Sequence, residues 1–168
     1  MINDDEAVIV FTAKSTEQIL NEGGSSAWRL DRTRAHFCTF VVCTRNAKSE
    51  WVAGLEAHHA AFLIGKLKDV IPSPEYKGRY ILRFSEYASV NLPNVWNGER
   101  NPVKYSTLHN IGIDPSRLKW QPMPEPNKTD LDVTHRVDLT PLSLTEAKER
   151  LAHTFGVLPT AIEIIVRG

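Results

Sequence analysis

The chain of 168 residues has few cysteines, no long apolar run and no excess of charge of either sign. Cys38 and Cys43 make no disulfide framework, and their odd spacing in one predicted strand would place them on opposite faces. The longest apolar run, residues 60–64, is far shorter than the roughly 20 residues that span a bilayer. The acidic start, Asp4-Asp5-Glu6, is unlike a secretory signal. We therefore expect a protein of the reducing cytoplasm with no membrane partner.

Charge is balanced over the whole chain but not along it. Twenty Lys and Arg residues cancel twenty Asp and Glu residues, which excludes a globally polycationic nucleic-acid binder. Residues 1–22 carry a net charge of −4, residues 23–120 carry +6 and residues 121–168 carry −2. The basic middle favours a polyanionic partner if its cations share one face, and an ordinary surface of mixed charge is the alternative.

Hydrophobic patterns predict several strands and few, short helices. Residues 7–12 form an uninterrupted β-rich run, and residues 36–45 alternate in a way that predicts a strand buried on both faces. Ser15-Thr16-Glu17-Gln18 has the form of a capping box, and Asp31 can cap one helical turn. Further strands are predicted at residues 60–71, 79–92 (bent near Glu86), 103–105 and 118–121, with loops at 23–28 and 93–102 and a helical turn from Ser106 to Leu108.

Runs of strands with short helices at the edges indicate an α+β fold with a small curved sheet or an open β-barrel. Pro122, Pro124 and Pro126 then predict a semi-extended linker over residues 122–132. Residues 133–168 are predicted to form a β-α-β unit, with a strand at 133–139, a helix at 143–155 and a strand at 162–166. The apolar stripe of this helix must be covered by the body or by a second copy of the chain, which would make a homodimer through residues 133–168.

Motifs for catalysis, metals and cofactors are missing. The chain has no Gly-x-Ser-x-Gly elbow, no Ser-x-x-Lys and no phosphate-binding Gly-rich loop. His58-His59 is the only histidine cluster, and adjacent strand residues would point to opposite faces. We therefore expect no bound metal, no cofactor and no catalytic residue of a known enzyme class.

Two tryptophans lie in loops rich in small and amide residues. Trp28 follows Gly23-Gly24-Ser25-Ser26-Ala27, and Trp96 lies among Asn94, Asn97 and Asn101. An exposed indole beside amides and guanidinium groups suits an unpaired or flipped base, which stacks on the ring while polar groups contact its edges. The alternative is that each tryptophan plugs one end of a small barrel.

The order of these features resembles the PUA-like superfamily and, within it, the EVE and ASCH-type domains. The resemblance covers residues 7 to about 121 and defines a predicted domain over residues 1–121. The segments that carry it are Gly23–Trp28, Phe40–Asn46, His59–Ile71, Arg79–Phe84 and Asn101–Leu108.

The resemblance implies a small open barrel that binds RNA or modified DNA, without catalysis. The residues implied at the site are Trp28 and Trp96 as stacking walls, Ser25, Ser26, Asn46 and Asn101 as groups that read base edges, and Arg45 and Arg100 on phosphates. Some ASCH-type members hydrolyse small amides or cut RNA with a Lys, a Thr or Ser and a Glu. The corresponding alternative is a hydrolase that uses Lys14 or Lys66 with Glu86, and a protein-interaction module is the third hypothesis.

Overall fold

A computed structural model describes residues 4–124 and 143–165 of the chain. The chain divides into two compact units, with the boundary between Asp130 and Leu131. The predicted strand at residues 133–139 and residues 125–132 of the predicted linker lie outside the described residues. Within the described residues, no helix is long and apolar enough to cross a membrane.

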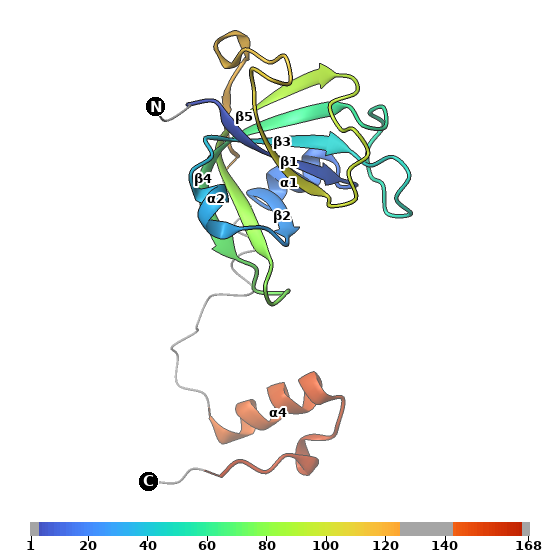
Figure 1. The fold of residues 1–168 in the computed structure, drawn as a ribbon. Helices are drawn as coiled ribbons and strands as arrows, with labels where there is room; N and C mark the ends of the chain where they lie inside the picture. Colours follow the sequence, from blue (N-terminus) through green and yellow to red (C-terminus); the bar gives the residue numbers. More distant parts are fainter. Residues whose placement is uncertain (1–3, 125–142, 166–168) are drawn as a thin grey trace. The chain divides into compact units, whose positions relative to one another are not determined.

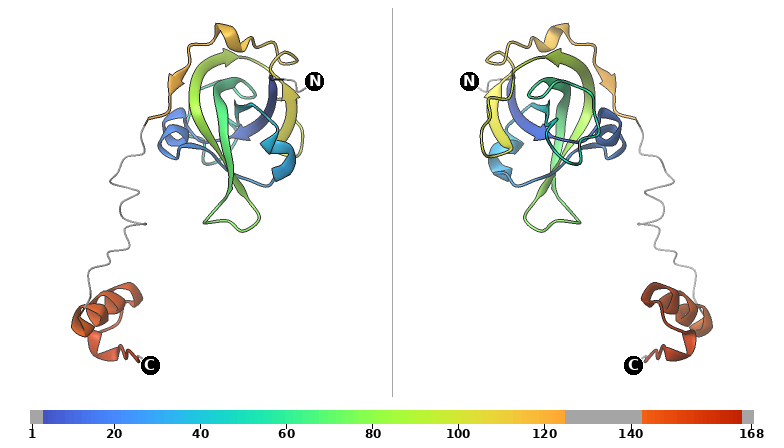
Figure 2. Two further views of the ribbon diagram at one scale, coloured as in Figure 1. Left: turned by 90° about the vertical axis from the view of Figure 1, so that its left-hand side faces the viewer. Right: turned by 90° about the vertical axis from the view of Figure 1, so that its right-hand side faces the viewer.

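A strongly curled mixed sheet forms the first unit (Figures 1 and 2). Its strand order is β2-β5-β4-β3-β1-β6, and β7 also pairs with β5. The pairing of β1 with β3 is parallel and the other pairings are antiparallel. This curled sheet with few helices confirms the predicted α+β class. The strands are β1 (Glu6–Thr12), β2 (Gly24–Trp28), β3 (Phe40–Arg45), β4 (Ala61–Pro72), β5 (Tyr80–Leu92), β6 (Val103–Thr107) and β7 (Gln121–Pro122).

The long hairpin of β4 and β5 carries much of the curvature. Its register shifts between Lys66 and Leu67, whose partners are Glu86 and Phe84, so the predicted bend near Glu86 is confirmed. Gly65 lies directly under the ring of Phe84, where an added Cβ would overlap the ring carbons. A glycine here lets the aromatic ring pack onto the strand that it crosses.

Alternate residues of the central strands enter two separate apolar clusters, one on each face of the sheet. In β3, Val41 and Cys43 belong to one cluster, here named the inner cluster. Phe40 and Val42 belong to the other, here named the outer cluster. All six residues of β3 are buried, as the sequence predicts. The inner cluster also includes Ile19, Trp28, Ala35, Leu82 and Phe84, and the outer cluster includes Val95, Trp96, Leu108 and Ile113.

Two short helices cover the inner face, and both begin where the sequence predicts. Helix α1 (Thr16–Asn21) starts at the capping box of Ser15 and Gln18. Helix α2 (Arg32–His36) starts after Asp31, whose carboxylate accepts from the backbone N–H of Arg34. Because α2 runs to His36, β3 begins only at Phe40 and the predicted strand start at residue 36 is wrong. Cys38 therefore lies outside β3, and both free cysteines belong to the inner cluster instead of opposite faces.

Three further boundaries differ from the predictions. The segment predicted as a loop at residues 23–28 is strand β2, which its pairing with β5 stabilises in spite of its glycine and serine content. Strand β6 continues to Thr107, so Ser106 caps no helical turn. The last short strand is β7 at Gln121–Pro122, preceded by the 3-10 turn η1 at Pro115–Arg117.

The second unit contains helix α4 (Leu144–Phe155) and the 3-10 turn η2 (Pro159–Ala161). The predicted capping box of Ser143 and Glu146 and the left-handed Gly156 are both present at the ends of α4. Residues 162–165 adopt no strand, so that part of the predicted β-α-β unit is wrong. Leu144, Leu151 and Phe155 are exposed on this unit. Dimerisation through residues 133–168 stays a prediction.

Candidate functional site

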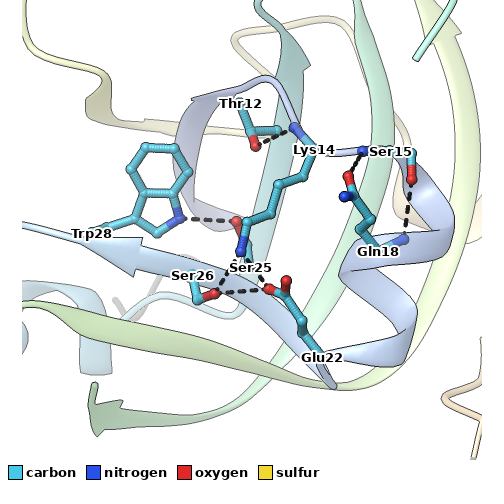
Figure 3. Close-up of polar contacts among 8 residues, drawn as sticks. All are labelled: Thr12, Lys14, Ser15, Gln18, Glu22, Ser25, Ser26 and Trp28. Atoms are coloured by element: carbon cyan, nitrogen blue, oxygen red, sulfur yellow. Dashed lines mark hydrogen bonds and ion pairs between the residues drawn. The ribbon is translucent and has the colours of Figure 1, made fainter. Parts of the chain in front are cut away.

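The connection from β1 to α1 and the strand β2 bring three polar side chains together. Lys14 follows the end of β1, and its own N–H donates to Thr12 Oγ1 over 3.1 Å. The capping box then fixes the next residues, since Ser15 N–H donates to Gln18 Oε1 and Ser15 Oγ accepts from Gln18 N–H. This local geometry directs the side chain of Lys14 toward β2 (Figure 3).

Lys14, Glu22 and Ser26 each contact the other two and together form a polar cluster (Figure 3). The ammonium of Lys14 lies 2.5 Å from Glu22 Oε2 and donates to Ser26 Oγ over 3.0 Å. The hydroxyl of Ser26 donates to the same Glu22 oxygen over 2.8 Å. The side chains of Lys14 and Glu22 remain 34% and 39% exposed, so a ligand in solution can reach this polar cluster.

Arg45 supports this polar cluster from within the core. Its side chain is fully buried, and Nη1 donates to the carbonyl oxygens of Thr12 and Lys14 over 3.3 and 2.6 Å. Nε donates to Glu56 Oε2 over 3.0 Å, and Nη2 lies 2.9 Å from that oxygen without hydrogen-bond geometry. The guanidinium also lies 4.0 Å from the centroid of the Phe62 ring. Arg45 therefore has no surface for a phosphate, and its role is to position the backbone of Lys14.

Ser25 and Trp28 contact each other on the side of β2 that packs against the inner cluster. Trp28 Nε1 donates to Ser25 Oγ over 2.9 Å, and both residues are buried. Burial raises the pKa of the neighbouring Cys43 thiol to about 12, although its hydrogen bond with Ser25 and the charge of Arg45 act in the opposite direction. Ser25 thus forms hydrogen bonds with the buried side chains of Trp28 and Cys43, while its neighbour Ser26 belongs to the polar cluster.

Trp96 packs on the other face of the sheet. It is 1% exposed, its ring stacks on Phe11 with centroids 5.1 Å apart, and Lys104 Nζ lies 4.8 Å from its centroid. Its Nε1 has no hydrogen-bond partner among the described residues. Because Trp28 and Trp96 belong to clusters on opposite faces, the structure does not place them as two walls of one pocket. Both positions agree with the alternative in which each ring plugs the fold.

The remaining predicted site residues are spread over other loops. Asn46 is partly buried, and its N–H donates to the carbonyl oxygen of Thr12 over 2.9 Å. Asn101 is exposed and its Oδ1 accepts from Val103 N–H over 3.4 Å, while Arg100 is exposed beside it. No hydrogen bond joins the side chains of Asn46, Arg100 or Asn101 to the polar cluster in the part of the chain that the structure describes.

Two arginines that sequence reasoning missed lie at the start of β5. Arg79 Nη1 donates to the carbonyl oxygen of Ala27 over 3.2 Å. The side chain of Arg83 lies beside Gly23, with Nη2 3.6 Å from the position of an added Cβ. The pairing of Gly24 with Arg83 and of Trp28 with Tyr80 brings both arginines to β2. Only this long-range pairing places them there, and no local pattern reveals it.

The second lysine considered for catalysis also forms an ion pair. Lys66 Nζ lies 2.7 Å from Glu86 Oε2 across β4 and β5, and 4.6 Å from the centroid of the Trp120 ring. Lys14 pairs with Glu22, so the alternative pairing of Lys14 with Glu86 is not formed. Of these two lysines, Lys14 is the one that contacts a hydroxyl group, that of Ser26, whereas Lys66 contacts Glu86.

Within residues 4–124 and 143–165, no group of three or more His, Cys, Asp and Glu side chains converges. The rings of His58 and His59 lie side by side, 4.0 Å apart, because both residues precede β4 and His59 has a positive φ. The expectation that they point to opposite faces of a strand is thus wrong. His58 Nδ1 accepts from the N–H of Ala47 over 3.0 Å.

Comparisons with known proteins identify no relative of this chain. No family model, no curated protein and no solved structure matches the chain.

Proposed function

We propose that the chain is a binding module for single-stranded nucleic acid, and that the strand lies across β2 and the start of β5. The observation that carries this proposal is the approach of three cations to residues 23–27. Lys14 donates to the Ser26 hydroxyl, Arg79 donates to the carbonyl oxygen of Ala27, and the side chain of Arg83 lies beside Gly23. Glu22 pairs with Lys14, and no carboxylate of the described residues forms an ion pair with Arg79 or Arg83, although Asp69 lies opposite Arg83 in the register of β4 and β5. The resulting excess of positive charge favours an anionic ligand.

The chemistry of these groups suits a polynucleotide better than a simple anion. Guanidinium groups donate two parallel hydrogen bonds to phosphate, so Arg79 and Arg83 are suited to consecutive phosphates of a strand. Ser26 and Glu22 add a hydroxyl and a carboxylate, which can accept from base amino groups. Base edges of this kind are exposed in single strands and loops, and this favours unpaired over duplex ligands.

The polar cluster supports binding more than hydrolysis. The Ser26 hydroxyl accepts from the Lys14 ammonium and donates to Glu22. A lysine that acts as a general base must instead accept the hydroxyl proton. The PUA-like resemblance agrees with a non-catalytic reader, and the curled sheet is compatible with it.

Fluorescence polarisation with labelled oligonucleotides of about 12 nucleotides tests the proposal, with single-stranded RNA and DNA compared against duplexes. We expect single strands to bind, and replacement of both Arg79 and Arg83 by Ala to weaken binding by about tenfold or more. The matched control replaces Arg117 and Lys119, exposed cations near η1 at the opposite end of the first unit (Figure 1). Equal loss in both double variants, or no binding to any oligonucleotide, would reject this site.

A further inference from the structure

The loop between β3 and β4 exposes large apolar side chains. Trp51 is 83% exposed and Leu55 is fully exposed, with Val52 between them at 36%. Trp28 and Trp96 are buried, and no other tryptophan of the described residues matches the exposure of Trp51. Exposing an indole to water forgoes the free energy of burying it, so a ring in this position calls for an explanation.

The loop is fastened to the site at several points along its length. Ala53 N–H donates to the carbonyl oxygen of Ala13 over 2.8 Å, one residue before Lys14. Glu56 binds the buried guanidinium of Arg45, and Gly54 lies so close to that guanidinium that an added Cβ would overlap it. At the base of the loop, Ala47 N–H donates to His58. These contacts hold the backbone of the loop in place, while the indole of Trp51 remains exposed to solvent.

These contacts limit the distance between Trp51 and the polar cluster. One residue, Val52, lies between Trp51 and Ala53, one backbone hydrogen bond joins Ala53 to Ala13, and Lys14 follows. With about 3.8 Å between consecutive Cα atoms and about 5.5 Å across the hydrogen bond, the Cα atoms of Trp51 and Lys14 lie within roughly 17 Å of each other. A few nucleotides of one strand can therefore span both positions.

We propose that Trp51 is a stacking platform for an unpaired base of the strand bound at β2. This inference rests on the proposed function and extends the site beyond its phosphate and edge contacts. Indole faces stack on all four bases, so the platform would add affinity without selecting a sequence. Lys48 is exposed three residues before Trp51, and the exposed Glu50, which directly precedes Trp51, offsets its charge. The short chain path from Trp51 to Lys14 of the cationic site is therefore what favours a nucleic acid over a protein as the occupant.

Replacement of Trp51 tests the platform by oligonucleotide affinity. We expect Trp51→Ala to weaken single-strand binding by about 5- to 150-fold, the range measured for loss of one base–aromatic stack, and Trp51→Phe to retain most of the affinity. Trp51→Leu keeps an apolar side chain without an aromatic face, and it should behave like Trp51→Ala. The control is Phe37→Ala, because Phe37, at 71%, is more exposed than any aromatic residue except Trp51 among those that the structure describes in the first unit.

A series of oligonucleotides with one abasic position identifies the stacked base directly. At one position of the series, removal of the base should weaken binding to the wild type but not to Trp51→Ala, since the variant has already lost the contact. Unchanged melting temperatures would show that the variants fold, as expected for an exposed side chain.

The possible failures are distinguishable. If the wild type binds no oligonucleotide, the proposed function itself fails. If the wild type binds and the Arg79 and Arg83 variants are weakened while Trp51→Ala is not, only the platform is rejected. Full retention of affinity in Trp51→Leu would overturn base stacking, because leucine has no aromatic face.

Discussion

The guanidinium of Arg45 donates a hydrogen bond of 2.6 Å from Nη1 to the carbonyl oxygen of Lys14. A fully buried side chain at the end of β3 thereby fixes the backbone of a residue whose own ammonium lies in the exposed polar cluster. The same guanidinium binds Glu56 of the loop that presents Trp51. Arg45 is thus the positioning residue that joins the core, the polar cluster and the Trp51 loop.

Arg45→Met should lower the free energy of unfolding by about 3 kcal/mol, because it leaves the carbonyl oxygen of Lys14 and the carboxylate of Glu56 without their donor. Urea denaturation followed by circular dichroism measures the loss. Arg117→Met is the control, since Arg117 is 85% exposed and its replacement should change stability by less than about 0.5 kcal/mol. Equal effects of the two substitutions would contradict the role assigned to Arg45.

Trp96 should matter for stability and not for binding. Trp96→Ala removes a fully buried ring that stacks on Phe11, and we expect a loss of about 3–5 kcal/mol. Trp96→Phe retains an aromatic ring and removes the unpartnered Nε1, so its loss should be smaller. Thermal melts and oligonucleotide titrations below the melting temperature separate the two properties. A stable Trp96→Ala variant with weakened binding would instead support Trp96 as a stacking wall.

His58 should make the protein less stable in mild acid. Partial desolvation, with His59 and Lys48 as lesser causes, lowers the pKa of His58 in the folded chain below its ordinary value of 6.5. The unfolded chain therefore binds a proton at higher pH than the folded chain does, and stability falls as pH decreases from above 6.5 toward the lower folded value.

The measurement for His58 is the free energy of unfolding at pH 8 and pH 5, compared with His58→Asn. The asparagine can still accept from Ala47 N–H through Oδ1, and it does not titrate. The variant should lose less stability between the two pH values than the wild type does. His109→Asn, at an exposed histidine, should leave the wild-type difference unchanged, and an identical pH response in all three proteins would refute the assignment.

Both cysteines should be inert in the folded protein. Burial raises the pKa of Cys38 to about 11 and that of Cys43 to about 12. At pH 8 the thiolate fraction is then on the order of one in a thousand or less, and the thiolate is the reactive form. A chromogenic disulfide reagent should label neither thiol of the native protein and both after denaturation. Rapid labelling of the native protein would show that the inner cluster is open to solvent.

Local signals in the sequence predicted much of the fold. The capping boxes at Ser15 and Ser143 and the cap at Asp31 located three helix starts, because these hydrogen bonds form between residues close in sequence. The buried run of β3 and the bend near Glu86 were also visible as patterns. Strand β2 was missed, since a Gly-Ser segment becomes a strand here only through its pairing with β5.

The site was predicted less well than the fold, for a physical reason. Sequence reasoning selected the two loop tryptophans Trp28 and Trp96, but burial depends on which elements fold over a ring. Of the proposed site, the sequence predicts Ser26 and offers Lys14 as an alternative, whereas Glu22, Arg79 and Arg83 approach residues 23–27 only through helix geometry and strand pairing. The exposure of Trp51 has no local signature either.

The salt dependence of single-strand binding tests the central claim most directly. Each phosphate contact at β2 should contribute about 0.7 to the slope of log affinity against log salt concentration. The variant with both Arg79 and Arg83 replaced by Ala should therefore show a slope about 1.4 shallower than that of the wild type, and the Arg117 and Lys119 control should keep the wild-type slope. An unchanged slope in the Arg79 and Arg83 variant would contradict a nucleic-acid site at β2.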